Sequence, residues 1–175
     1  MLAGQLSGRK LIICPPVLIN QWKNVLNDLN IVAQVESLGK LDKILPYVDR
    51  FKYVFIDEAH RFRHDTTENY SLLHKICYGK KIVLISATPI NNYSTDIENQ
   101  LALFQSKRNC TIPGVPNLEK FFGDLNKRLK ELPKDSAEYF EQIQRNSAEI
   151  RDKILRHVMI RRTRGEILQF YADDL

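Results

Sequence analysis

The chain has 175 residues, of which 43% are hydrophobic and 27% are charged, and its composition excludes a disordered or fibrous protein. Its net charge of +5 suits a polyanionic partner but does not identify one. The apolar runs are too short to cross a bilayer, and three cysteines without a Cys-x-x-Cys pair argue against a disulfide framework or a zinc site. We therefore expect a cytoplasmic protein with no membrane contact.

The first half of the chain alternates between apolar runs and helical patterns. Three short runs rich in β-branched residues, at 11–14, 53–56 and 82–85, each lead into a polar or proline-containing turn. A weaker fourth run, at 31–35, lies between the first two. Continuous apolar runs of this length are typical of parallel strands that are buried on both faces. The pattern predicts an α/β fold with a parallel sheet.

Apolar residues between these runs recur at the spacing of one helical face, which predicts helices that flank the sheet. The two sets are Leu18, Trp22, Val25 and Leu29 after the first run, and Tyr70, Leu73 and Ile76 after the second. Gly79 then supplies a natural helix stop.

The second half of the chain is helical in pattern from about Ser94 onward, so the sheet is predicted to end there. Asp135 with Glu138 is typical of a capping box that opens one long helix reaching about residue 158. That helix is expected to pack on the helix before it. Their two apolar stripes are Leu118, Phe121, Phe122, Leu125, Leu129 and Leu132, and then Phe140, Ile143, Ile150, Ile154 and Val158.

Two adjacent carboxylates, Asp57 and Glu58, directly follow the second strong strand. Open parallel sheets bind their ligands at the carboxyl ends of the strands, so this is where a nucleotide would lie. Asp57 would hold Mg²⁺ mostly through water, and Glu58 would orient and deprotonate the water that attacks the γ-phosphate. The alternative is a salt-bridged surface turn. The Asp-Glu-Ala-His sequence after four apolar residues favours the nucleotide site.

Small residues, Ser86, Ala87 and Thr88, follow the next strand in the same way. Alone they would be a weak helix-cap signal. Because adjacent parallel strands end at the same edge of a sheet, we expect His60 to hydrogen-bond Ser86 or Thr88 and to couple the phosphate state to this segment.

With these motifs the chain resembles the superfamily-two DEAH-type helicases, and within them the Swi/Snf-related DNA translocases. Four segments carry the resemblance in the family's order. Residues 11–22, a strand with a Pro-Pro turn and a helix carrying a tryptophan, are similar to motif Ia. Residues 54–60 are similar to motif II and residues 84–92 to motif III. Residues 157–164 are similar to the segment that leads toward the second motor lobe.

The resemblance implies a RecA-like lobe of a P-loop NTPase that uses ATP and Mg²⁺ and moves on DNA, with an RNA helicase as an alternative. It implies catalytic roles for Asp57, Glu58 and His60, and a coupling role for Ser86, Ala87 and Thr88. It further implies that the second lobe of the same parent chain is a partner. The residues expected to contact nucleic acid or that lobe are Pro15, Trp22, Arg161, Arg162 and Arg164.

The chain departs from the family most clearly in that its sequence contains no Gly-x-x-x-x-Gly-Lys-Ser/Thr, the loop that cradles phosphates. We therefore expect a fragment of a bacterial motor. Residues 1–106 would be a partial first lobe with motifs Ia, II and III, and residues 107–175 a helical insertion with the start of the inter-lobe linker. The isolated fragment is expected to hydrolyse no ATP and to hold no cofactor tightly. The alternative is a complete, non-enzymatic RecA-like module that binds nucleic acid or protein.

Overall fold

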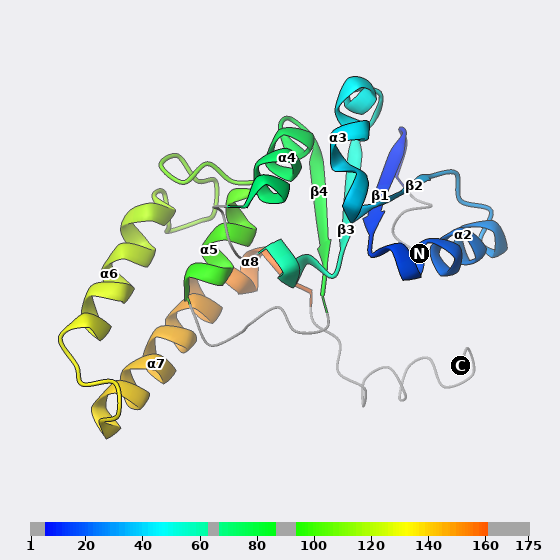
Figure 1. Cartoon of the computed structure of the whole chain (residues 1–175). Coiled ribbons are helices and arrows are strands. Elements are labelled where there is room, and N and C mark those ends of the chain that lie inside the picture. The colour runs from blue at the N-terminus through cyan, green and yellow to red at the C-terminus, as the bar shows by residue number, and fades with distance from the viewer. Residues whose placement is uncertain (1–5, 63–66, 87–93, 161–175) are drawn as a thin grey trace. The chain divides into compact units, whose positions relative to one another are not determined.

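The computed structural model describes residues 6–62, 67–86 and 94–160, and these separate into two compact units with the boundary between Lys107 and Arg108 (Figure 1). The first unit contains a sheet with flanking helices, and the second contains helices. In the described part of the chain, no helix is both long and apolar enough to span a bilayer.

The first unit is built on a four-stranded parallel sheet in the order β2-β1-β3-β4. The strands are β1 (Lys10–Cys14), β2 (Gln34–Ser37), β3 (Tyr53–Asp57) and β4 (Lys81–Ile85). The apolar residues of β1 and β3 are buried, as expected of strands covered on both faces. The predicted α/β class and its three strong strands are confirmed.

The weaker strand begins later than predicted. Residues 31–35 were expected to form it, whereas β2 starts at Gln34. The residues before it close the preceding helix: Asn30 has a left-handed φ of 51°, and the Ile31 N–H donates to the carbonyl of Leu26 at 2.8 Å. Val32 is 88% exposed. The first part of the apolar run is therefore a connection rather than a strand.

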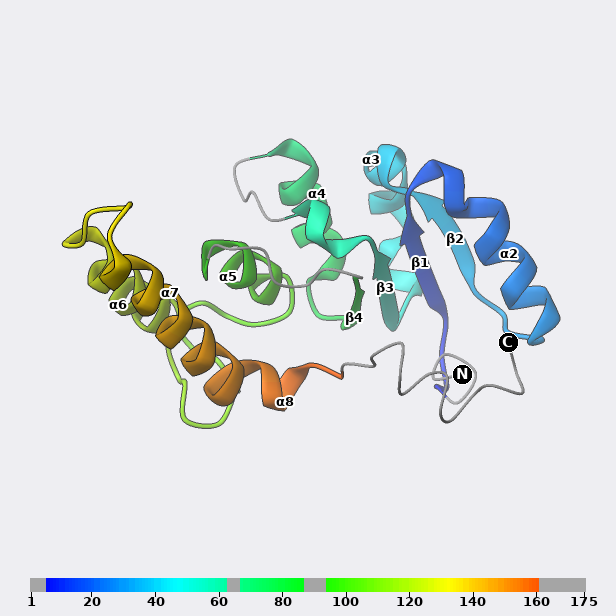
Figure 2. The ribbon, with the colours of Figure 1, turned by 90° about the horizontal axis from the view of Figure 1, so that it is seen from below.

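Helices cover both faces of the sheet (Figure 2). Successive residues of a strand point to opposite faces, so each strand contributes side chains to both layers of packing. On one face, Ile12 and Phe55 pack with Leu26 of α2 (Ile19–Asp28). On the other face lie α3 (Leu41–Ile44) and α4 (Glu68–Cys77), together with the 3-10 turns η2 (Leu38–Lys40), η3 (Leu45–Arg50) and η4 (Ala59–Phe62). The same unit also contains α5 (Ser94–Ala102).

The two flanking helices differ in how well the sequence predicted their buried face. In α4, Tyr70, Leu73 and Ile76 are all buried, and Gly79 follows with a left-handed φ of 69°. In α2 the buried residue is Leu26, whereas Leu29 is 47% exposed. The chain enters α2 through the 3-10 turn η1 (Pro16–Leu18), so Leu18 precedes the α-helix.

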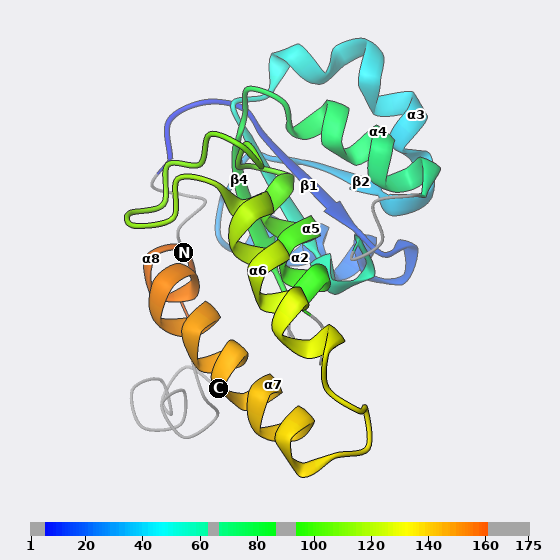
Figure 3. The same ribbon diagram turned by 90° about the vertical axis from the view of Figure 1, so that its left-hand side faces the viewer.

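The second unit contains α6 (Leu118–Lys130) and α7 (Ala137–Ile150), which lie side by side (Figure 3). The π-helical segment η5 (Arg151–Leu155) and the short α8 (Arg156–Val158) continue the second helix. The capping box predicted at Asp135 is wrong. Ser136 caps α7, because its side-chain oxygen accepts from the Tyr139 N–H at 3.1 Å, so the helix begins at Ala137.

The apolar stripes of the second unit agree only in part with the sequence pattern. Leu118, Phe122 and Leu125 of α6 are buried, as are Ile150 and Ile154. Phe140, the first residue of the other predicted stripe, is 57% exposed, and Val158 at its end is also exposed. The buried face of the second helix therefore begins and ends inside its predicted stripe.

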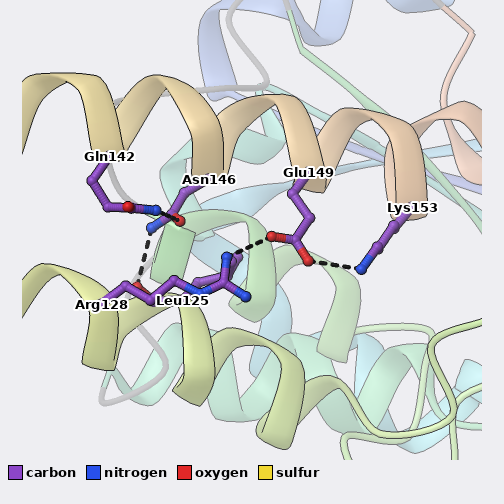
Figure 4. Close-up of polar contacts among 6 residues, drawn as sticks. All are labelled: Leu125, Arg128, Gln142, Asn146, Glu149 and Lys153. Atoms are coloured by element: carbon purple, nitrogen blue, oxygen red, sulfur yellow. Dashed lines mark hydrogen bonds and ion pairs between the residues drawn. The ribbon is translucent and has the colours of Figure 1, made fainter.

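A buried asparagine lies between these stripes and connects the two helices (Figure 4). The Asn146 side chain is 3% exposed, donates to the Leu125 carbonyl at 3.1 Å and accepts from Gln142 Nε2 at 2.8 Å. A buried amide with satisfied hydrogen bonds favours one alignment of two helices over shifted ones.

An ion-pair network lies one turn further along α7. The Glu149 carboxylate accepts from Lys153 Nζ at 2.8 Å and from Arg128 of α6 at 2.6 Å (Figure 4). These two hydrogen bonds lower the pKa of Glu149. The stability that the network contributes is therefore present above the ordinary carboxylate pKa and is lost as the pH falls through the lowered value.

Candidate nucleotide site

The strand order places a topological switch point between β1 and β3. The chain leaves β1 toward β2 on one side, and β3 then pairs on the other side of β1. Ligands of open α/β sheets bind outside the carboxyl ends of strands at such a point. Here β1 ends at Cys14, followed by the buried Pro15, and β3 ends at Asp57. In Figure 1 these ends lie at the lower edge of the sheet.

Both oxygens of the Asp57 carboxylate accept hydrogen bonds within the protein. Oδ1 accepts from the backbone N–H of Glu58 at 2.9 Å, and Oδ2 accepts from the indole Nε1–H of Trp22 at 2.8 Å. The backbone bond comes from the next residue along the chain, but the indole comes from α2. The carboxylate is therefore held in one orientation at the end of β3.

Glu58 has a left-handed backbone, with a φ of 54°. This conformation costs about 1–2 kcal/mol for a residue with a Cβ, and such strain is concentrated at functional sites. It turns the chain sharply from β3 into η4, where the Arg61 N–H donates to the Glu58 carbonyl at 3.0 Å. The Glu58 side chain stays partly exposed.

His60 belongs to η4, which follows β3, and it contacts Ser86 in the segment that follows β4. Its Nδ1 is 3.0 Å from Glu58 Oε2 and 3.2 Å from Ser86 Oγ. A proton on Nδ1 would be directed at the Glu58 carboxylate, which accepts, so this ring nitrogen lies within hydrogen-bond reach of both Glu58 and Ser86. Ala87 and Thr88 lie outside the described residues, as do Arg161, Arg162 and Arg164.

Sequence reasoning did not place two side chains, those of Trp22 and Cys14, beside Asp57. Trp22 was expected to contact nucleic acid or a second lobe, and the structure places its indole N–H on Asp57. Cys14 was given no role at this edge, and the structure shows that it is fully buried. Burial, and then the negative charge of Asp57, raises the pKa of Cys14 to about 11. The position of Cys14 at the end of β1, next to β3 in the sheet, was the available signal.

The raised pKa of Cys14 predicts a loss of stability in alkali. The contribution is present below the ordinary thiol pKa of 9.0 and is lost as the pH rises toward about 11. Cys14→Ala should therefore flatten the fall in the free energy of unfolding over this range, measured by denaturant titration. Burial raises the pKa of Cys77 to about 12, so Cys77→Ala is the matched variant. In addition, Asp57→Asn should lower the Cys14 pKa, and an unchanged thiol titration would contradict the proximity of the two groups.

The residues at this edge fit a magnesium ion that a nucleotide brings with it. Within residues 6–62, 67–86 and 94–160, no group of three His, Cys, Asp or Glu side chains could hold a metal by itself. Mg²⁺ commonly keeps several waters and binds through one or two carboxylates together with substrate phosphates. Asp57 is a suitable carboxylate for such a site, because each of its oxygens keeps a lone pair after the two hydrogen bonds.

The parallel sheet with helices on both faces, and the DEAH sequence at the end of its strand β3, agree with the RecA-like fold that the resemblance implies. The model of the SNF2-related domain matches residues 25–171, which is most of the chain. The chain belongs to the SNF2-related domain family.

Two known proteins are similar to the chain. The ATP-dependent helicase YqhH of Bacillus subtilis is 27% identical over 124 residues, which cover 60% of this chain and 22% of that protein. The SWI2/SNF2 ATPase core of Sulfolobus solfataricus, solved in complex with double-stranded DNA, has a TM-score of 0.53 and 15% identity. That match covers 78% of this chain and 32% of the solved chain. The chain therefore spans between a fifth and a third of these proteins, and the structural likeness supports the fold.

Proposed function

We propose that this chain is part of the first motor lobe of an ATP-dependent DNA translocase or helicase, and that its own share is to position and activate the water that hydrolyses ATP. The observation that carries the proposal is the arrangement of Asp57, Glu58 and His60 at the carboxyl edge of the sheet, with His60 bridging Glu58 and Ser86. The SNF2-related family and its helicase relatives support it.

In this proposal Asp57 binds the water shell of a nucleotide-bound Mg²⁺, which would neutralise charge on the phosphates. Glu58 orients the attacking water and takes its proton, since its carboxylate is partly exposed and lies one residue away. The His60 Nδ1–H directs one Glu58 oxygen and leaves the other for water. Movement of Ser86 would shift this donor, and this is how hydrolysis would be coupled to the segment after β4.

DNA is the proposed partner, together with a second RecA-like lobe. The solved SWI2/SNF2 relative is in complex with double-stranded DNA, and this chain carries a net charge of +5. Arg161, Arg162 and Arg164 are proposed to contact DNA or the second lobe, because basic residues neutralise phosphates. Pro15 is proposed to lie near the same partner, since it follows the end of β1.

The test compares the 175-residue chain with the complete motor, meaning a protein that carries this segment together with a phosphate loop and a second lobe. We expect the complete motor to hydrolyse ATP and duplex DNA to stimulate it, and the 175-residue chain alone to show no Mg²⁺-dependent hydrolysis. Arg161→Ala, Arg162→Ala and Arg164→Ala combined should reduce DNA stimulation more than basal hydrolysis and should flatten the salt dependence of DNA binding.

The matched control replaces three exposed basic residues of α6, Lys120, Lys127 and Lys130, by alanine. Equal loss of stimulation in both triple variants would show that net charge alone matters. A motor without DNA-stimulated hydrolysis would contradict the translocase proposal and would favour a non-enzymatic binding module.

A further inference from the structure

Trp22 is the only tryptophan in the chain, and its indole makes a polar contact with a residue that is far from it in the sequence. Its Nε1–H donates to Asp57 Oδ2 over 2.8 Å, and the two residues are 35 positions apart. A separation of 2.8 Å lies within the usual range of N–H···O hydrogen bonds. This contact joins the helix after β1 to the carboxylate at the end of β3.

The indole is itself held by the strands that form the site. Trp22 packs on the cluster that contains Ile12 of β1 and Phe55 of β3, and these two residues are paired in the sheet. Phe55 lies two residues before Asp57 on the same strand. The donor and the acceptor therefore rest on one rigid support, so their separation is set by packing and not by a flexible side chain.

The second hydrogen bond removes the remaining rotational freedom of the carboxylate. The Glu58 N–H binds Oδ1 at 2.9 Å, while Trp22 binds Oδ2. With one hydrogen bond on each oxygen, the plane of the carboxylate is held and each oxygen keeps a lone pair for a further contact. Without the indole, Oδ2 would be restrained only through the bond to Oδ1, and the carboxylate could turn about it.

We infer that Trp22 is a positioning residue for Asp57, whose indole N–H fixes the carboxylate in the orientation that receives the water shell of a divalent cation. The inference rests on the proposed function for the identity of that cation as nucleotide-bound Mg²⁺. In the competing interpretation the bond merely satisfies a half-buried indole, as buried tryptophans usually require. That role would affect stability but not cation binding.

The hydrogen bond is tested on the 175-residue chain. Since the chain has one tryptophan, its proton–nitrogen correlation spectrum contains one indole signal. We expect Asp57→Ala to shift this signal and to speed the exchange of its proton with solvent. Asp49→Ala is the control, because the Asp49 side chain is exposed and its ion pair is with Lys80, at 3.4 Å. An indole signal that responds equally to both variants, or to neither, would overturn the inference.

The positioning role is tested in the complete motor with Trp22→Phe, which removes the N–H and keeps an aromatic ring. At saturating ATP, the Mg²⁺ concentration for half-maximal hydrolysis should rise roughly tenfold, as expected for the loss of a hydrogen bond to a charged group. Leu26→Val is the matched control: Leu26 is buried in the same cluster, and its apolar side chain has no group that could donate a hydrogen bond to Asp57.

A purely structural role predicts that both variants lower the melting temperature and that neither changes the Mg²⁺ dependence. That result would overturn the inference. A motor that hydrolyses no ATP even without substitutions would instead overturn the proposed function, and the indole signal would still decide whether Trp22 holds Asp57.

Discussion

Glutamine in place of Glu58 should give a motor that binds ATP and hydrolyses it about 10²–10⁴-fold more slowly. The substitution removes the group that takes the proton from water and keeps the size of the side chain. It also keeps an oxygen that can accept from His60 Nδ1, now 3.0 Å from Glu58 Oε2. The structure around the site should therefore persist while the chemical step is lost.

Two quantities are measured separately for each variant, the turnover rate and the dissociation constant for ATP. Glu68→Gln is the matched control, since Glu68 lies in the first turn of α4 and is exposed. It should change neither quantity. Parallel loss of binding and turnover in Glu58→Gln would mean that Glu58 maintains the structure and is not the base.

Alanine in place of Phe122 should destabilise the second unit by about 3–5 kcal/mol, the usual cost of a phenylalanine removed from a packed core. Phe122 of α6 is fully buried, and its ring meets that of Phe121 edge-to-face with centroids 5.3 Å apart. A cavity of this size cannot be refilled without movement of the helices.

Phe140→Ala is the matched control for this prediction, because the same atoms are removed from a side chain that is 57% exposed. It should cost less than about 1 kcal/mol. Denaturant unfolding followed by far-ultraviolet circular dichroism measures both variants, since the single tryptophan lies in the first unit and does not report on the second. Equal costs would contradict the assignment of the buried face.

The sequence was sufficient to predict the sheet, because β1, β3 and β4 are short apolar runs bounded by turns, and such runs have few alternatives in a chain of this length. The position of Asp57 and Glu58 at a strand end followed directly from the same pattern. In contrast, the start of β2 depended on how α2 ends, through Asn30, and apolar content alone misplaced it.

Contacts between elements could not be predicted in the same way. Helical periodicity marked a face of α2 but placed Leu29 on it, whereas Leu26 is the buried residue. The bond from Trp22 to Asp57 joins residues 35 positions apart, so no local pattern predicts it. In the second unit, periodicity likewise did not reveal that Asn146, a polar residue, is buried where the two helices meet.

The left-handed backbone at Glu58 has a consequence for any attempt to improve the protein. Glycine tolerates that conformation without the cost that a Cβ imposes, and asparagine tolerates it better than most residues. Selection for thermal stability alone would thus favour replacements at this position that discard the acid. Directed evolution of this domain must screen activity together with heat resistance, because at Glu58 the two properties favour different amino acids.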